Sequence, residues 1–354
     1  MNYLIRLLTS LVLLLTISCS NDTENDVKEE VKEEFYLGAD VSWITEMEHQ
    51  GHKFYNSKGF AADGIALLKS YGINAIRLRV WVDPSDHGGW CSKEDVLAKA
   101  LRAKMLNMDV MIDFHYSDWW ADPSKQDIPK EWKGHSYEML KDDVTRHTTD
   151  VLTLLKKNGI TPRWVQVGNE TSNGMLSPIG QADKNPTQYA GLFMAGYKAV
   201  KNVFPDTKVI VHLDSGHNKD LYNWNLDILK NNGAKWDIIG MSVYPYWAKL
   251  PADEVISRSI NNINHLAKKY HCDIMVVETG MECADNNGNL APNSVLKESH
   301  RQLSTLINEC RTNTQGHCKG IFYWEPECRP STYRLGAFTE DGKATVIMDA
   351  FKTR

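Results

Sequence analysis

The sequence predicts an α/β fold built as one closed (β/α)8 barrel, and three observations support this prediction. Apolar strand-like runs alternate with helical patterns over residues 35–354, as is typical of a parallel sheet covered by helices. Eight such units fit the usual length of a barrel domain. No Gly-x-Gly-x-x-Gly follows the first run, which argues against a dinucleotide-binding sheet. We therefore expect a TIM barrel that forms a single catalytic domain.

The eight expected strands are short runs rich in Val, Ile and aromatic residues, each bounded by turn residues. In chain order they cover residues 35–42, 75–81, 110–115, 164–170, 208–213, 238–244, 274–278 and 320–324. Most residues in these runs are apolar. This pattern fits strands that are buried on both faces.

The helices between them are indicated by apolar spacing and by end signals. Residues 63–72 end on Gly72, and residues 144–157 stop just before Gly159, as expected for glycine C-caps. Ser92 and Asp95 open residues 96–101 in the spacing of a capping box, with Asp in place of the usual Glu. Three further helical patterns cover residues 190–203, 256–269 and 295–308.

The first 34 residues are expected to serve export rather than the fold. Arg6 precedes an apolar run over residues 7–15 that is too short to span a membrane, so residues 1–18 are interpreted as a signal peptide. Thr16-Ile17-Ser18-Cys19 resembles a bacterial lipobox. It implies a lipid anchor on Cys19 that attaches the protein to a membrane. An ordinary signal peptide with an incidental cysteine is the alternative.

Residues 19–34 form a polar, acidic tether that cannot bury a core. Its acidic start resembles the export signal of surface lipoproteins in Bacteroides-like bacteria. The alternative is a solvated linker that carries no export signal. We expect an exported lipoprotein of the outer membrane, on the cell surface. The sequence leaves the surface and periplasmic faces undecided.

The composition narrows the class of protein. Apolar and charged residues make up 42% and 24% of the chain, as in globular proteins. The net charge of −5 without a basic run argues against nucleic acid as a partner. The 11 tryptophans are a surplus that suggests flat apolar faces for sugar rings, although about half would serve the core. A monomer is expected, but the oligomeric state cannot be derived.

Six cysteines remain after Cys19, and an even number in an exported protein allows up to three disulfides. They are Cys91, Cys272, Cys283, Cys310, Cys318 and Cys328. Five lie late in the chain, so we expect disulfides that stiffen the late loops, with the pairing left open. No pair has Cys-x-x-Cys spacing, which argues against a zinc site on sulfur.

Polar residues gather where the predicted strands end, at the face where barrel active sites form. They are Asp40, Arg77, His115, Asn169, Glu170, Tyr244, Glu278 and Trp324. A ring of buried ionisable groups without a function would be costly. His212, Asp214 and His217 form a further trio, but their spacing is weak support for a metal.

Glu170 and Glu278 each follow an apolar strand, and two strand-end carboxyls are what a retaining glycosidase needs. Either alone could be a surface acid. Together they predict an acid and a nucleophile on opposite sides of a sugar. Asn169 is expected to donate to the sugar 2-hydroxyl, and Arg77 to hold Glu278 ionised. Arg79 shares the strand parity and the charge of Arg77, so by spacing alone it is an equal candidate for holding Glu278 ionised. Tyr244 could hydrogen-bond Glu278, and Trp324 could form the floor of the sugar-binding site.

Several motifs in chain order resemble glycoside hydrolase family 53. They are Gly38 to Ser42, Arg77 to Pro84, Asp113 to Pro123, Gln166 to Glu170, Ser242 to Pro245 and Gly320 to Pro326. The resemblance runs from about residue 36 to residue 350. It implies an arabinogalactan endo-β-1,4-galactanase that cuts pectic galactan and type I arabinogalactan with retention of configuration.

By this resemblance Glu170 is the acid/base and Glu278 the nucleophile. Asp40, Arg77, His115, Asn169, Tyr244 and Trp324 would bind the substrate, with Trp119 and Trp120 as stacking platforms. No cofactor is required. Some family members bind calcium after the seventh strand, where Asp285, Asn287 and Asn289 are weak candidate ligands and a polar turn is the alternative. A disulfide of Cys283 could replace the metal. A β-mannanase, a cellulase and a non-catalytic glycan-binding lipoprotein remain alternative functions.

Overall fold

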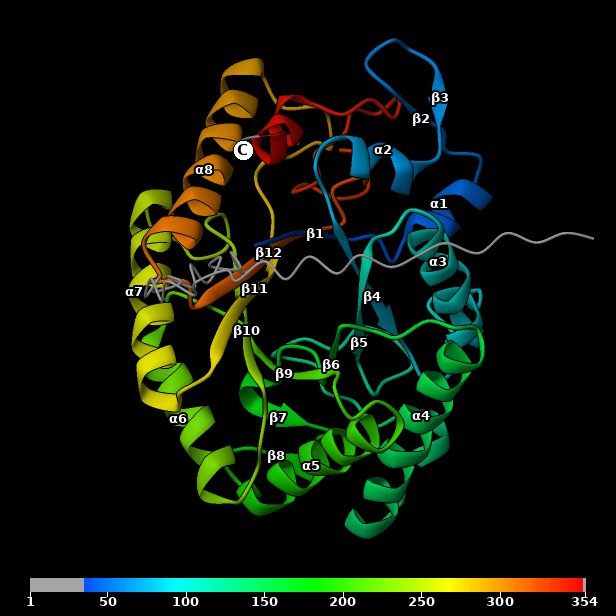
Figure 1. The fold of residues 1–354 in the computed structure, drawn as a ribbon, viewed down its shortest axis with the longest axis vertical. Helices are drawn as coiled ribbons and strands as arrows, with labels where there is room; N and C mark the ends of the chain where they lie inside the picture. The colour runs from blue at the N-terminus through cyan, green and yellow to red at the C-terminus, as the bar shows by residue number, and fades with distance from the viewer. Residues whose placement is uncertain (1–34, 353–354) are drawn as a thin grey trace, which may run out of the picture. The chain divides into compact units, whose positions relative to one another are not determined.

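The computed structural model describes residues 35–352, and in this range the eight predicted strands close into one parallel barrel (Figure 1). The order around the barrel is β1-β12-β11-β10-β9-β6-β5-β4. The strands are β1 (Tyr36–Asp40), β4 (Ala75–Val80), β5 (Asp109–Phe114), β6 (Trp164–Val167), β9 (Lys208–Leu213), β10 (Ile238–Val243), β11 (Asp273–Thr279) and β12 (Cys318–Trp324). The predicted barrel is confirmed. The predicted signal peptide, tether and Cys19 lie outside the described residues.

Helices surround the strands in Figure 1. They are α1 (Ile44–His49), α2 (Gly64–Ser70), α3 (Lys93–Met105), α4 (Tyr137–Lys157), α5 (Pro186–Val203), α6 (Lys219–Asn231), α7 (Ala252–Tyr270) and α8 (Asn293–Thr312). The six predicted helices correspond to α2, α3, α4, α5, α7 and α8. Helices α1 and α6 were not predicted. Two small hairpins were not predicted either, β2 (Phe54–Tyr55) with β3 (Ala61–Ala62) and β7 (Gly174–Met175) with β8 (Gly180–Gln181).

The helix ends show which of the predicted capping signals are present in the structure. The Ser92 side chain accepts from the N–H of Asp95, but the Asp95 carboxylate accepts from Cys91 rather than from Ser92. The capping box is therefore only half formed. After α4, Gly159 has a φ of +68° and Ile160 N–H bonds the carbonyl of Leu155, so the predicted glycine C-cap is present.

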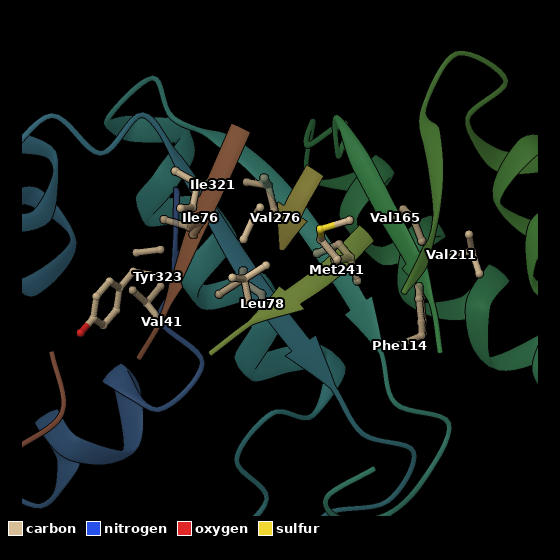
Figure 2. Close-up of a cluster of buried hydrophobic side chains, with 14 of the residues drawn as sticks. Val41, Ile76, Leu78, Phe114, Val165, Val211, Met241, Val276, Ile321 and Tyr323 are labelled. Carbon is tan, nitrogen blue, oxygen red and sulfur yellow. The ribbon is translucent and has the colours of Figure 1, made fainter. Parts of the chain in front are cut away.

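The main hydrophobic core fills the space between the strands and the helices. Figure 2 shows part of this core and labels Ile76, Leu78, Val165 and Ile321 among its buried side chains. A second apolar cluster lies on the other face of the strands, and its members include Ala75, Met111, Trp164, Ile210 and Phe322. Side chains alternate across a strand, so this second cluster fills the barrel interior.

The alternation of side chains along each strand also determines which polar residues face the barrel interior. Arg77 has the same parity as Ala75, and Asp113 has the same parity as Met111, each two residues nearer the carboxyl end. The barrel interior is therefore apolar at its amino-terminal half and polar at its carboxyl-terminal half. Gly38 supports this packing, because a Cβ there would lie 2.1 Å from the ring of Phe322.

The cysteines correct the expectation of disulfides. All six cysteines between Cys91 and Cys328 are free thiols in this structure. Cys310 and Cys318 lie in side-chain hydrogen-bonding contact with each other. Elsewhere, Cys91 donates to the carbonyl of Ser42, and Cys283 donates to that of Phe338. The late loops are held by backbone hydrogen bonds and packing instead. Separately, none of the helices in residues 35–352 has the length and apolar content needed to cross a membrane.

Candidate active site

A cavity of about 510 Å3 opens at the carboxyl ends of the strands. Aromatic and polar side chains from many strand ends line it together. They include Trp43, His115, Trp120, Asn169, Glu170, Asp214, Ser242, Tyr244, Trp247, Glu278, Trp324 and Tyr333. A hollow with flat apolar walls and a few polar groups suits a sugar ring.

Glu170 reaches this cavity through an unusual turn. β6 ends at Val167, Gly168 takes a φ of +82°, and Glu170 takes a φ of +44° with a ψ of +52°. Left-handed backbone is uncommon for a residue other than glycine, and it clusters at functional sites. A Cβ on Gly168 would lie 2.5 Å from Thr171. The turn directs both Asn169 and Glu170 into the polar end of the barrel.

Glu278 is turned inward by an irregularity in strand pairing. Met241 pairs with Val276, but the next residue, Ser242, pairs with Glu278, so one residue of β11 is skipped. A bulge of this kind redirects the side chains beyond it. As a result Val277 packs in the barrel interior and the following Glu278 also faces the cavity.

Arg77 is the centre of the polar end of the barrel. Its guanidinium lies 2.6 Å from Asp40, 2.9 Å from Asp113 and 2.8 Å from Glu278. It also donates to the amide oxygen of Asn169 at 2.9 Å. The Arg77 side chain is buried, and a buried cation is tolerable because these acceptors surround it.

The two carboxyls have different surroundings. Oε1 of Glu278 meets Arg77, and Oε2 accepts from the Tyr244 hydroxyl at 3.1 Å. Burial raises the pKa of Glu278 to about 7, while Arg77 opposes that rise. No cation among the described residues forms an ion pair with Glu170, so burial and the nearby charge of Glu278 raise its pKa well above the usual range. Environments that separate two carboxyls in this way favour an ionised Glu278 beside a protonated Glu170.

His115 lies between the ion pairs of Arg77 and the tryptophans that line the cavity. Its Nε2 lies 3.0 Å from Asp113, and its Nδ1 accepts from the N–H of Ala121 and the indole N–H of Trp81. These contacts place the imidazole proton on Nε2. His115 therefore bridges the Arg77 network to the loop that carries Trp120.

Three tryptophans that line the cavity pack against one buried cation, Arg79. The guanidinium of Arg79 lies 4.3 Å from the ring of Trp120 and within 6 Å of Trp43 and Trp324. Arg79 is held by an ion pair with Glu325. Cation–π contacts of a desolvated Arg can each be worth about 2 kcal/mol. Arg79 thus supports the three indoles that line the cavity and does not contact Glu278.

The structure brings most of the predicted site residues together. His115, Trp120, Asn169, Glu170, Tyr244, Glu278 and Trp324 line the cavity. Asp40 and Arg77 lie beneath it and are fully buried, so they act through other side chains. Trp119 lies apart, stacked on His87 with ring centroids 3.7 Å apart. It lines a neighbouring hollow.

The weak calcium candidates form a self-contained turn. The carboxylate of Asp285 accepts from the backbone N–H groups of Asn287 and Asn289. Within residues 35–352, no group of three or more His, Cys, Asp or Glu side chains is placed to hold a metal ion. The trio of His212, Asp214 and His217 is therefore not arranged as such a group.

Several residues that build the site were not singled out from the sequence. Asp113 and Gln166 hold Arg77, and Ser242 lies beside Glu170. His212, named above only as a weak metal candidate, also lies beside Glu170. Strand parity could have identified Asp113 and Gln166, because they occupy the inward positions next to Arg77 in the barrel. Trp43, Trp247 and Tyr333 come from loops, where no periodic signal exists.

Replacing Arg77 with Met is expected to lower the free energy of unfolding by about 3–5 kcal/mol, because it leaves buried carboxylates unpaired. The carboxylates concerned are Asp40, Asp113 and Glu278. The loss should shrink at lower pH, where Glu278, whose pKa is raised to about 7, becomes protonated. Urea unfolding at several pH values measures it. Arg258→Met is the control, since Arg258 forms an exposed pair with Glu254 worth under about 1 kcal/mol. Equal losses in both variants would contradict the role given to Arg77.

Comparison with known proteins agrees with the geometry. The chain is 31% identical to "Endo-beta-1,4-galactanase" of Bacillus subtilis (strain 168), over 90% of this chain and 75% of that protein. It is 32% identical to "Arabinogalactan endo-beta-1,4-galactanase" of Thermothelomyces thermophilus, over 90% of this chain and 98% of that protein.

A solved structure, the "Ignisphaera aggregans GH53 catalytic domain", matches with a TM-score of 0.82 and 32% identity, covering 91% of this chain and 97% of that one. The family model for glycosyl hydrolase family 53 matches residues 36–350. This match spans the whole barrel and both carboxyls, and the chain therefore belongs to glycosyl hydrolase family 53.

Proposed function

We propose that this protein is an endo-β-1,4-galactanase that hydrolyses pectic galactan and type I arabinogalactan by a retaining double displacement. The observation that carries the proposal is the pairing of Glu170 and Glu278 in one cavity with opposite protonation preferences. The galactan substrate is supported by the printed activities of the relatives from Bacillus subtilis and Thermothelomyces thermophilus.

In the proposed mechanism, Glu278 attacks the anomeric carbon while Glu170 protonates the departing oxygen. Arg77 and Tyr244 hold one oxygen each of Glu278, which keeps the nucleophile oriented and ionised. The resulting galactosyl-enzyme is hydrolysed by a water that Glu170 deprotonates. Two displacements at the same carbon restore the β-configuration.

Asn169 is proposed to contact the sugar 2-hydroxyl. Its amide oxygen is occupied by Arg77, and its nitrogen donates to the carbonyl of Ala121 at 2.8 Å. An amide nitrogen carries two hydrogens, so one remains for the substrate. Trp324 and Trp120, supported by Arg79, are proposed to stack on the sugar chain.

A panel of soluble polysaccharides tests the substrate. Purified protein should release mixed oligosaccharides early from galactan and leave β-mannan and cellulose uncut. Preferred hydrolysis of mannan or cellulose would replace the galactan assignment with a related glycosidase. Binding without any release would favour a glycan-capturing protein. Activity should persist after treatment with a calcium chelator, since no cofactor is proposed.

The pH dependence of kcat/KM on galactan follows from the two carboxyls. Activity should rise as pH increases through about 7, because the pKa of Glu278 is raised to about 7 and the nucleophile must be ionised. It should fall at higher pH as Glu170 loses its proton, since the pKa of Glu170 is raised further. Initial rates at low substrate across pH 5–10 measure both limbs. An optimum near pH 4 would contradict the inferred protonation states.

We also propose that the chain is exported and anchored to the outer membrane through Cys19, facing the cell surface. The sequence Thr16-Ile17-Ser18-Cys19 and the acidic tether support this. Cys19→Ser should abolish incorporation of labelled palmitate and release the protein from membranes. Labelling that is unaffected by this change would overturn the proposal. The monomeric state is proposed as well, and light scattering of purified protein tests it.

A further inference from the structure

Glu170 is held through one of its oxygens by a chain of side chains from two neighbouring strands. The Ser242 hydroxyl donates to Oε1 of Glu170 at 2.6 Å, and Nε2 of His212 lies 2.9 Å from the same hydroxyl oxygen. His212 is fully buried, and Ser242 is almost so. Among the described residues none hydrogen-bonds Oε2 of Glu170.

The surroundings of His212 decide which of its nitrogens carries the proton. Nδ1 accepts from the backbone N–H of Glu170 at 3.3 Å and lies 2.9 Å from the amide nitrogen of Gln166. A backbone N–H cannot turn away, and the Gln166 amide is fixed because its oxygen accepts from Arg77. Nδ1 also lies 3.1 Å from Oδ1 of Asn169, but that oxygen already accepts from Arg77, whereas the backbone N–H of Glu170 is directed at Nδ1. We therefore assign Nδ1 as an acceptor. Burial and the charge of Arg77 lower the pKa of His212 well below its usual value, so the ring is neutral and its single proton is on Nε2.

The direction of each hydrogen bond follows from that proton. Nε2–H of His212 donates to the Ser242 oxygen, so the hydroxyl hydrogen of Ser242 is free for Oε1 of Glu170. Oε1 is then an acceptor whether Glu170 is ionised or not. A proton on Glu170 can be carried only by Oε2.

We propose that Ser242, held by His212, is a positioning residue that keeps the transferable proton of Glu170 on Oε2, the oxygen left free for substrate. The inference rests on the proposed function, since it concerns the acid step of that reaction. In this step the Oε2–H bond breaks and a new O–H bond forms on the glycosidic oxygen, whose bond to the anomeric carbon breaks. Ser242 stays on Oε1, where its hydrogen bond strengthens as Glu170 becomes negatively charged.

Ser242→Ala with Ser242→Thr as the matched control tests the proposal, because Thr keeps the hydroxyl. In the Ala variant the alkaline limb of kcat/KM should move up by about one pH unit, since a hydrogen bond to the carboxylate is lost. The charged groups that face Glu170 are Glu278, Asp214 and Arg77, and these variants alter none of them. The Thr variant should restore the wild-type limb.

Leaving-group dependence separates acid positioning from a structural fault. Phenyl β-1,4-galactobioside needs protonation of its leaving group, and its cleavage should fall roughly tenfold in Ser242→Ala. The 2,4-dinitrophenyl substrate leaves without help, so its cleavage should be nearly unchanged. Equal losses on both substrates, or an alkaline limb that does not move, would overturn the proposal.

A measurement on the unmodified protein keeps the proposal testable if the Ala variant fails to fold. In 15N spectra of histidine-labelled protein, the resonance assigned by its loss in His212→Gln should show a neutral Nε2–H tautomer. A proton on Nδ1 would overturn the inference. Wild-type protein that cleaves neither aryl galactoside would contradict the proposed function itself rather than this inference.

Discussion

Replacing Glu278 with Ala is expected to lower kcat on galactan by roughly 10⁴-fold or more, the scale on which groups that act only in the transition state contribute. Glu278 lies 2.8 Å from Arg77 and accepts from Tyr244, so its loss removes the attacking oxygen and leaves the rest of the cavity in place. Affinity for galactan should persist. Initial rates and binding isotherms on the same preparation measure the two effects separately.

Azide makes this first prediction more specific. The Ala variant leaves space beside the anomeric carbon, and azide that enters it should attack an activated aryl substrate from the side of the missing carboxylate. The product should be the α-galactosyl azide, formed by a single inversion. Glu282→Gln is the control. Glu282 lies four residues further along and pairs with Arg334 at 3.1 Å, and its loss should leave turnover unchanged. Undiminished hydrolysis by Glu278→Ala would refute the assignment.

Glu170→Gln is expected to lower hydrolysis of galactan and of phenyl galactosides by roughly 10²–10⁴-fold, the usual contribution of a general acid. Gln keeps an oxygen that can accept from Ser242, so the fold of the site should be retained. Cleavage of the 2,4-dinitrophenyl substrate should show a rapid burst followed by slow turnover, because the second step loses its base.

The azide product again distinguishes the roles of the two carboxyls. In Glu170→Gln, azide should intercept the galactosyl-enzyme and give the β-galactosyl azide, whereas the Glu278→Ala variant gives the α-product. The alkaline limb of the pH profile should also disappear, since the group that titrates there is absent. A β-azide from the Glu278 variant would reverse the assignment of the two residues.

The sequence was sufficient to predict the barrel, because eight buried strands give runs with little ambiguity. Each of the eight barrel strands lies within three residues of its predicted range. Helix α6 was missed because residues 219–231 include three Asn and two Asp, which weaken both helix propensity and apolar spacing. In the structure, Asn218 caps it by accepting from the N–H of Leu221.

Strand ends predicted most of the residues that line the cavity, but they could not rank them. Arg77 and Arg79 share one parity, and both point into the barrel. Only the structure shows that Arg77 meets Glu278 while Arg79 pairs with Glu325 beneath the indoles. The bulge opposite Ser242 was also invisible, because it depends on pairing between β10 and β11. Adjacent tryptophans behave differently for a similar reason: Trp120 lies over Arg79, and Trp119 lies against His87.

The central claim is that Glu278 forms a covalent bond with galactose during turnover, and trapping this intermediate tests it most directly. The enzyme would be incubated with a 2,4-dinitrophenyl 2-deoxy-2-fluoro-β-galactobioside, which slows the second displacement, and then digested for mass spectrometry. We predict one sugar adduct per chain, located on the peptide that contains Glu278. An adduct on another residue, or inactivation of a working enzyme with Glu278 unmodified, would contradict the claim.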